Sequence, residues 1–188
     1  FNLSNVSFSA DGDEVFDVDE RGATPGFHIG TTFDIPLGEI FAIETGVLLS
    51  TKGYQYKYGS GENTSKSTVN ILNAEIPLSF KTILGINDDL NVYVSAGGYL
   101  GLGLVAISHY KTKFNGEVDK DGEFIDFEDD GFQRLDYGLT FGAGIELKGF
   151  IIGASYDLGL ANIIDSEFYE MRNRVLKIGV GYRFGWDN

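Results

Sequence analysis

Apolar and polar residues alternate along most of this chain, most regularly between residues 134 and 147. Because successive side chains of a β-strand point to opposite faces, this segment predicts a strand with one apolar face and one small or polar face. The apolar face contains Leu135, Tyr137, Leu139, Phe141, Ala143, Ile145 and Leu147. The other face contains Arg134, Asp136, Gly138, Thr140, Gly142, Gly144 and Glu146.

The same alternation recurs along the chain and predicts eight strands. They cover residues 1–8, 25–34, 40–56, 69–83, 90–110, 134–147, 150–160 and 173–184. Long polar loops (9–24, 57–68, 111–133, 161–172) alternate with tight turns (35–39, 85–89 and 148–149). Short periplasmic turns and longer extracellular loops are typical of outer-membrane barrels. The pattern predicts an all-β fold over residues 1–188, a single eight-stranded antiparallel up-and-down transmembrane β-barrel with long acidic extracellular loops. Since the pattern is already under way at Phe1, we expect the first strand to be truncated at its start.

The polar face of the predicted strands decides which side meets lipid. A soluble barrel would carry its apolar residues inside and a water-facing surface crowded with charged side chains. Here the polar face is mostly glycine, serine and threonine, with one or two charges of either sign per strand. Buried charges require partners, so we expect an ion-paired interior and an apolar outer surface in contact with lipid. The predicted interior network contains Glu44, Glu75, Lys81, Asp136, Glu146, Asp157, Lys177 and Arg183.

Aromatic residues on the apolar face support this orientation, because they gather near the ends of the predicted strands. Outer-membrane barrels carry such aromatic girdles at both membrane interfaces. The residues concerned are Phe27, Phe33, Phe41, Phe80, Tyr137, Phe150, Tyr156, Tyr182 and Phe184.

Composition and charge narrow the function classes. The chain has 26 glycines and no cysteine, which suits a narrow barrel and excludes disulfides and thiol chemistry. No apolar run approaches the roughly 20 residues of a transmembrane helix. The net charge is −14, and the acidic residues concentrate in segments 8–24 and 113–131. This acidity argues against a nucleic-acid partner and against docking onto anionic lipid through a basic surface.

Five segments of the chain resemble the PorT-like outer-membrane β-barrel family, which carries an outer membrane protein beta-barrel domain. They are GFHIGTTFDIPL (26–37), LNAEIPLSFK (72–81), VYVSAGGYLGLGL (92–104), YGLTFGAGIEL (137–147) and NRVLKIGVGYRF (173–184). FNLSN (1–5) is similar to the end of that family's first strand. The resemblance implies the barrel fold. The namesake of the family is associated with protein secretion across the outer membrane, and the shared motifs carry no catalytic signature.

One loop has the spacing of a calcium site. In EVDKDGEFIDFE, carboxylates alternate, a glycine follows, and a glutamate stands where an EF-hand has its bidentate ligand. The candidate ligands are Glu117, Asp119, Asp121 and Glu128. The alternative is a solvated acidic loop. We expect no other cofactor.

Catalytic chemistry has few candidate residues. The only histidines are His28 and His109, on different predicted strands. Ser108 adjoins His109, but neighbouring residues of a strand face opposite ways and cannot form a dyad. We therefore expect no enzyme, although lipid-modifying barrel enzymes remain an alternative.

The expectation is an integral outer-membrane protein of a Gram-negative bacterium with a plugged polar interior. It would act as a structural, accessory or binding component, in a secretion complex or another envelope complex. Its partners would be outer-membrane lipid and other envelope proteins. A small-solute or ion channel is the alternative, in which the interior charges form an ion path.

Overall fold

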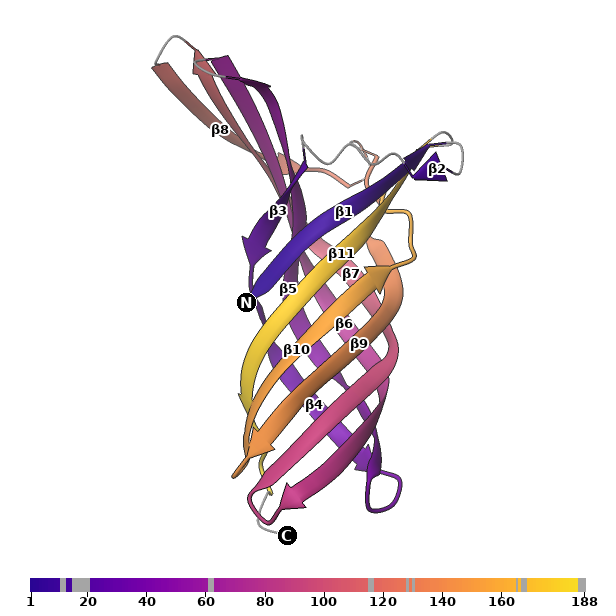
Figure 1. Cartoon of the computed structure of the whole chain (residues 1–188). Coiled ribbons are helices and arrows are strands. Elements are labelled where there is room, and N and C mark those ends of the chain that lie inside the picture. Colours follow the sequence, from indigo (N-terminus) through magenta and orange to yellow (C-terminus); the bar gives the residue numbers. More distant parts are fainter. Residues whose placement is uncertain are drawn as a thin grey trace.

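The computed structural model describes residues 1–10, 13–14, 21–60, 63–114, 117–127, 129, 131–164, 166 and 169–185. Its strands are β1 (Asn2–Ala10), β2 (Asp13–Glu14), β3 (Arg21–Gly26), β4 (His28–Pro36), β5 (Phe41–Ser60), β6 (Asn63–Asn87), β7 (Leu90–Phe114), β8 (Glu117–Ile125), β9 (Leu135–Leu147), β10 (Phe150–Gly159) and β11 (Tyr169–Tyr182). All of them belong to one antiparallel sheet (Figure 1). No helix in the described part of the chain is long and apolar enough to cross a membrane.

The sheet curves round until its last strand meets its first. Its order is β11-β10-β9-β7-β6-β5-β3-β1, and β1 also pairs with β11, for example Leu3 opposite Leu176. β3 and β4 both pair with β5 and are separated only by Phe27, so they share one position in the wall. The eight predicted strands all overlap strands of this sheet, and the larger number arises from this interruption and from β2 and β8.

The seam between β4 and β11 is closed by side chains rather than by a ladder. In the described residues, β4 pairs only with β5, and the pairing of the N-terminal strand with β11 ends at Phe1, whose backbone exchanges hydrogen bonds with that of Ile178. Figure 1 accordingly places the N-terminus at mid-height of the sheet. Below it, an ion pair joins Asp34 to Arg183, and the imidazole of His28 lies so close to Gly179 that an added Cβ there would be 2.9 Å from its Nε2.

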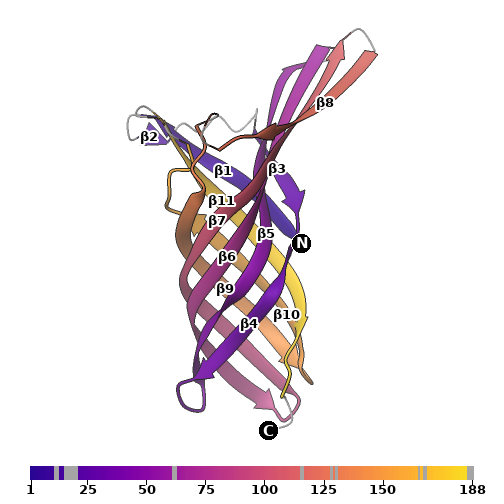
Figure 2. The ribbon, with the colours of Figure 1, turned by 180° about the vertical axis from the view of Figure 1, so that it is seen from behind.

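Four strands continue past one end of the closed sheet and form a projecting arm. It consists of the upper ends of β5, β6 and β7 together with β8, and it extends beyond the rest of the molecule in two opposite views (Figures 1 and 2). The predictions of loops at 57–68 and 111–133 are therefore wrong in large part, because β5, β6, β7 and β8 run through them. These strands are polar on both faces, so their sequences lack the alternation that reveals a half-buried strand.

The outer face of the wall is apolar and exposed, as predicted. Val180 is 86% exposed and Phe150 65% exposed, and all nine residues of the predicted aromatic girdles are exposed. Some of these rings pack together along the surface, including Phe41 with Phe80 and Phe150 with Tyr182. An apolar surface of this extent is not stable in water, so it identifies the face that contacts lipid.

An apolar cap lies at the arm end of the sheet, above the polar interior. It gathers side chains from five strands and from the connections that follow β8 and β10. The buried members are Val6, Tyr54, Val69, Ile71, Ala106, Phe127, Ile163 and Met171. A bridge between Phe132 and Ile164 ties the two connections together. The alternation of apolar and polar residues does not reveal this cap, because its members come from distant segments of the chain.

Candidate functional site

The inward polar residues form two charge clusters inside the sheet. The upper cluster lies nearer the arm and contains Lys52, Glu75, Asp136, Asp157 and Lys177. Lys52 Nζ is 2.8 Å from both Glu75 Oε1 and Asp136 Oδ2. Lys177 Nζ is 2.5 Å from Glu75 Oε2 and 2.7 Å from Asp157 Oδ2. None of these five side chains is more than 8% exposed.

Neutral groups complete the upper cluster. Asn173 Nδ2 donates a hydrogen bond to Asp136 Oδ2 at 2.9 Å, and the Tyr99 hydroxyl lies 3.3 Å from the same oxygen. The Lys52 ammonium also lies 4.0 Å from the centre of the Tyr99 ring. A buried ion pair is stable only when its remaining hydrogen-bonding groups are satisfied. Tyr99 and Asn173 perform this role for Asp136.

The lower cluster lies nearer the tight turns and contains Asp34, Glu44, Lys81, Glu146 and Arg183. Lys81 Nζ is 3.1 Å from Asp34 Oδ2, 3.1 Å from Glu44 Oε2 and 3.5 Å from Glu146 Oε1. Arg183 pairs with Asp34, and its second nitrogen is 2.9 Å from Glu146 Oε2. The ring of Tyr93 lies 4.4 Å from the Lys81 ammonium.

These ion pairs connect strands that are not neighbours in the sheet. Lys52 of β5 reaches Asp136 of β9, and Lys177 of β11 reaches Glu75 of β6. The side chains therefore cross the interior instead of lining an open tube. Chemically, the arrangement fixes the wall and fills the space within it.

The chain matches a known family over most of its length. Residues 1–165 match the family described as the outer membrane protein beta-barrel domain. The chain belongs to this family. It is an outer-membrane protein of a Gram-negative bacterium.

Solved structures similar to this outer-membrane barrel protein include two of Ail, the attachment invasion locus protein of Yersinia pestis. One, in complex with the heparin analogue sucrose octasulfate, has 15% identity and a TM-score of 0.38, and the match covers 97% of this chain and 94% of that one. The other has 15% identity, the same coverage and a TM-score of 0.34. No curated protein sequence matches this barrel protein.

All eight residues predicted for the interior network lie in the two charge clusters of this barrel protein. The prediction omitted Lys52 and Asp34, although the alternation already placed both on the inward face. Arg134, also inward by the pattern, lies outside the clusters. Its guanidinium is 4.4 Å from the centre of the Phe127 ring, in the apolar cap.

The predicted calcium ligands are part of the arm. Glu117, Asp119 and Asp121 lie in β8, where they pair with residues of β7, and Glu128 lies outside the described residues. Asp121 Oδ1 accepts a hydrogen bond from the backbone N–H of Gly122 at 2.8 Å. The described residues contain no group of three or more histidines and carboxylates suited to a metal ion. Calcium binding stays a prediction.

The two histidines lie in different parts of the structure. His28 Nδ1 donates to Asn2 Oδ1 at the seam between β4 and β11. His109 is exposed on the arm, whereas the adjacent Ser108 is buried and faces the other way.

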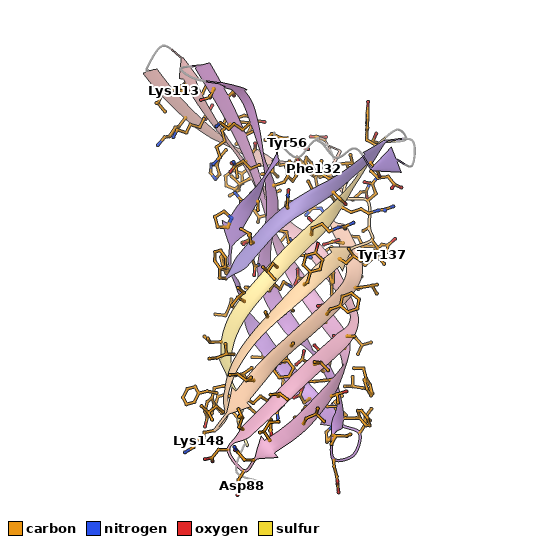
Figure 3. The ribbon with its side chains drawn as sticks, in the orientation of Figure 1. Tyr56, Asp88, Lys113, Phe132, Tyr137 and Lys148 are labelled. Carbon is orange, nitrogen blue, oxygen red and sulfur yellow. The ribbon has the colours of Figure 1, made fainter. Side chains whose placement is uncertain are left out.

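Figure 3 shows that side chains also project outward along the wall, with Tyr137 near the arm end and Asp88 and Lys148 at the turn end.

Proposed function

We propose that this protein is an eight-stranded outer-membrane barrel that acts as a structural and binding component of the envelope, not as a solute channel. The observation that carries the proposal is the filled interior. Two charge clusters cross it, and an apolar cap lies above them. Eight strands enclose only enough space for side chains, so little room is left for a solute.

The projecting arm supports a binding role. It presents a large solvated surface of four paired strands, and the wall can close without these parts of the strands. In barrels, specific functions reside in such extensions and loops, which a rigid scaffold holds in place. The resemblance to the PorT-like family extends the proposal to an accessory role in a secretion complex or another envelope complex.

Two measurements test the proposal. Purified protein in planar lipid bilayers should give no conductance steps above the background of protein-free bilayers. Purification from native membranes in a gentle detergent should retain envelope proteins in stoichiometric amounts, identified by mass spectrometry. Conductance steps that disappear when the interior of the barrel is blocked would instead support a small-solute or ion channel. Purification of the barrel alone, with no bound partner, would contradict the accessory role.

A further inference from the structure

Two strand edges face each other across the seam between β4 and the lower part of β11. Within the described residues, β4 pairs only with β5, and β11 pairs with β10 on one side and with the N-terminal strand as far as Phe1 on the other. Above this point β1 lies between β11 and β3, and β4 follows β3 in the same position of the wall. The seam is therefore in line with β1 and one strand position wide, which separates β4 from β11 by roughly 10 Å.

Backbone groups of β11 point into this seam. Ile178 exchanges both of its backbone hydrogen bonds with Phe1. In an antiparallel ladder, every second residue directs its N–H and C=O groups to the same neighbour, so Val180 and Tyr182 direct theirs into the seam. No water is available to such groups in a lipid-facing wall, so leaving them unpaired is costly. The backbone of a further strand supplies the partners that they require.

The exposure of the seam residues shows that each edge is covered on one side only. Val180 is 86% exposed, whereas Ile152, which lies opposite it on β10 and also faces lipid, is 54% exposed. Thr32 of β4 points inward and is nevertheless exposed, whereas Gly46, opposite it on β5, is buried. A strand between the two edges would cover Val180 and Thr32.

The register of β1 with β11 determines which residues of such a strand would face the interior. The first residue upstream of Phe1 would be opposite Gly179 and would point inward, as the buried Asn2 does. The imidazole of His28 already lies there, since a Cβ on Gly179 would be 2.9 Å from its Nε2. This position of the strand therefore accepts only a small residue.

The lower end of the seam favours a hydrogen-bond donor. Asp34 Oδ1 is buried and accepts no hydrogen bond within the described residues. Because Asp34 pairs with Arg183 across the seam, an inward residue opposite Arg183 would lie close to this oxygen. A carboxylate is disfavoured there, since the lower charge cluster already holds three carboxylates and only two cations.

We propose that the seam binds one further β-strand, an in-line extension of β1 by residues upstream of Phe1 that pairs with both β11 and β4. The strand runs antiparallel to both neighbours, and its residue opposite Val180 faces lipid and is apolar. A strand from a second copy is disfavoured, because its end would meet the end of β1 within the bilayer, where charged termini are costly. The proposal goes beyond the role in the envelope and does not depend on whether the interior conducts.

The test is disulfide trapping in the full-length protein, in which the proposed strand is present. Residues 1–188 contain no cysteine. A cysteine at the second residue upstream of Phe1 is combined with Val180→Cys, which the register places directly opposite it, with Cα atoms about 5.5 Å apart. We expect most of the protein in native membranes to form this internal disulfide, seen as a shifted monomer band on a gel without reductant.

Ile152→Cys, with the same upstream cysteine, is the matched control. Ile152 faces lipid at the height of Val180 but lies on the far side of β11, at a distance of two strand positions. Its disulfide yield should be on the order of tenfold lower, because Cα atoms more than about 7 Å apart cannot be bridged. Equal yields from the two pairs, or no bond in either, would overturn the proposal. A disulfide-linked dimer would also overturn it, because a second copy would then supply the strand.

The small residue expected next to Phe1 provides a second readout. Tryptophan at the first upstream position should reduce the disulfide yield with Val180→Cys, because its ring would collide with the imidazole of His28. Adding His28→Ala should restore the yield, since it clears this space. An unchanged yield with tryptophan, or no recovery with His28→Ala, would contradict the proposed register.

Discussion

At the scale of single residues, Lys52 is the centre of the upper charge cluster. It is almost fully buried and pairs with two carboxylates, Glu75 and Asp136, on different strands. Removing one partner from a buried ion pair leaves an uncompensated charge, which costs far more than the loss of an exposed pair. Lys148, by contrast, pairs with Asp89 at 3.4 Å with both side chains mostly exposed.

We expect Lys52→Met to lower the free energy of unfolding by about 3–5 kcal/mol. Lys148→Met should change it by less than about 1 kcal/mol. The measurement is urea unfolding of the protein in lipid vesicles, followed by tryptophan fluorescence. Adding Asp136→Asn to Lys52→Met should restore part of the stability, because it removes one of the stranded charges. Equal effects of the two single lysine variants would mean that the interior pairs do not stabilise the barrel.

Gly138 of β9 and Gly101 of β7 are both buried on the inward face, but their surroundings differ. A Cβ at Gly138 would lie 2.2 Å from Leu158 O and 2.8 Å from Gly159 Cα, which are rigid backbone atoms of β10. A Cβ at Gly101 would meet no atom closer than 3.5 Å. The close approach of β10 therefore requires glycine at position 138, whereas position 101 has room for a larger side chain.

Gly138→Ala should destabilise the protein by about 1–3 kcal/mol, since β9 and β10 must separate locally to admit the methyl group. Gly101→Ala is the control and should be nearly neutral. The same urea titration in vesicles measures both variants. A neutral Gly138→Ala would show that β9 and β10 can move apart freely.

At the scale of elements, the strands of the wall follow the alternation closely, while two local features modify it. Lys148 and Gly149, with φ of 51° and 83°, form the two-residue turn that the sequence predicted between β9 and β10. In β7, the register with β6 shifts between Leu72 and Asn73, which leaves Leu104 as an extra residue. This bulge exchanges the inward and outward positions of β7, and a simple two-residue period cannot follow it.

The outward face of β9 provides a direct test of orientation. Leu139→Arg places a charge on the lipid side and should cost about 2–4 kcal/mol near the middle of the bilayer. Leu135→Arg, on the same face nearer the arm end of the wall, should cost less, because the penalty falls toward the interface. Unfolding in vesicles compares the two. Variants as stable as the parent would place this face away from lipid.

At the scale of the whole molecule, closure of the sheet depends on a short contact between its first and last strands. β1 pairs with β11 along its whole length, whereas β4 and the lower part of β11 are joined only through side chains. These pairings join the two ends of the chain, so they form only when the complete wall is assembled.

A disulfide tests this closure in a chain that has no cysteine of its own. Leu3→Cys with Leu176→Cys should oxidise readily in the folded protein, because opposite residues of an antiparallel pair have Cα atoms about 4.5–5.5 Å apart. Leu3→Cys with Ile178→Cys is displaced by two residues and should bridge poorly. Gel mobility without reductant reports the bond. Failure of the first pair would show that the sheet is open at this edge.

The sequence by itself determined the strands of the wall, the direction of their side chains and the membrane they occupy. Except at the bulge in β7, whether a strand residue of the wall points inward depends on its place in a two-residue period, and lipid favours apolar residues at the outward positions. Glu75 and Asp136 could thus be assigned to the interior from the sequence. Lys52 lies on the same inward face, but its pairing with them could not be predicted, because contacts across the interior depend on how far the strands are shifted relative to one another. The cap and the arm also required the tertiary structure. Their residues come from distant segments, and the strands of the arm have water on both faces, so neither burial nor alternation marks them in the sequence.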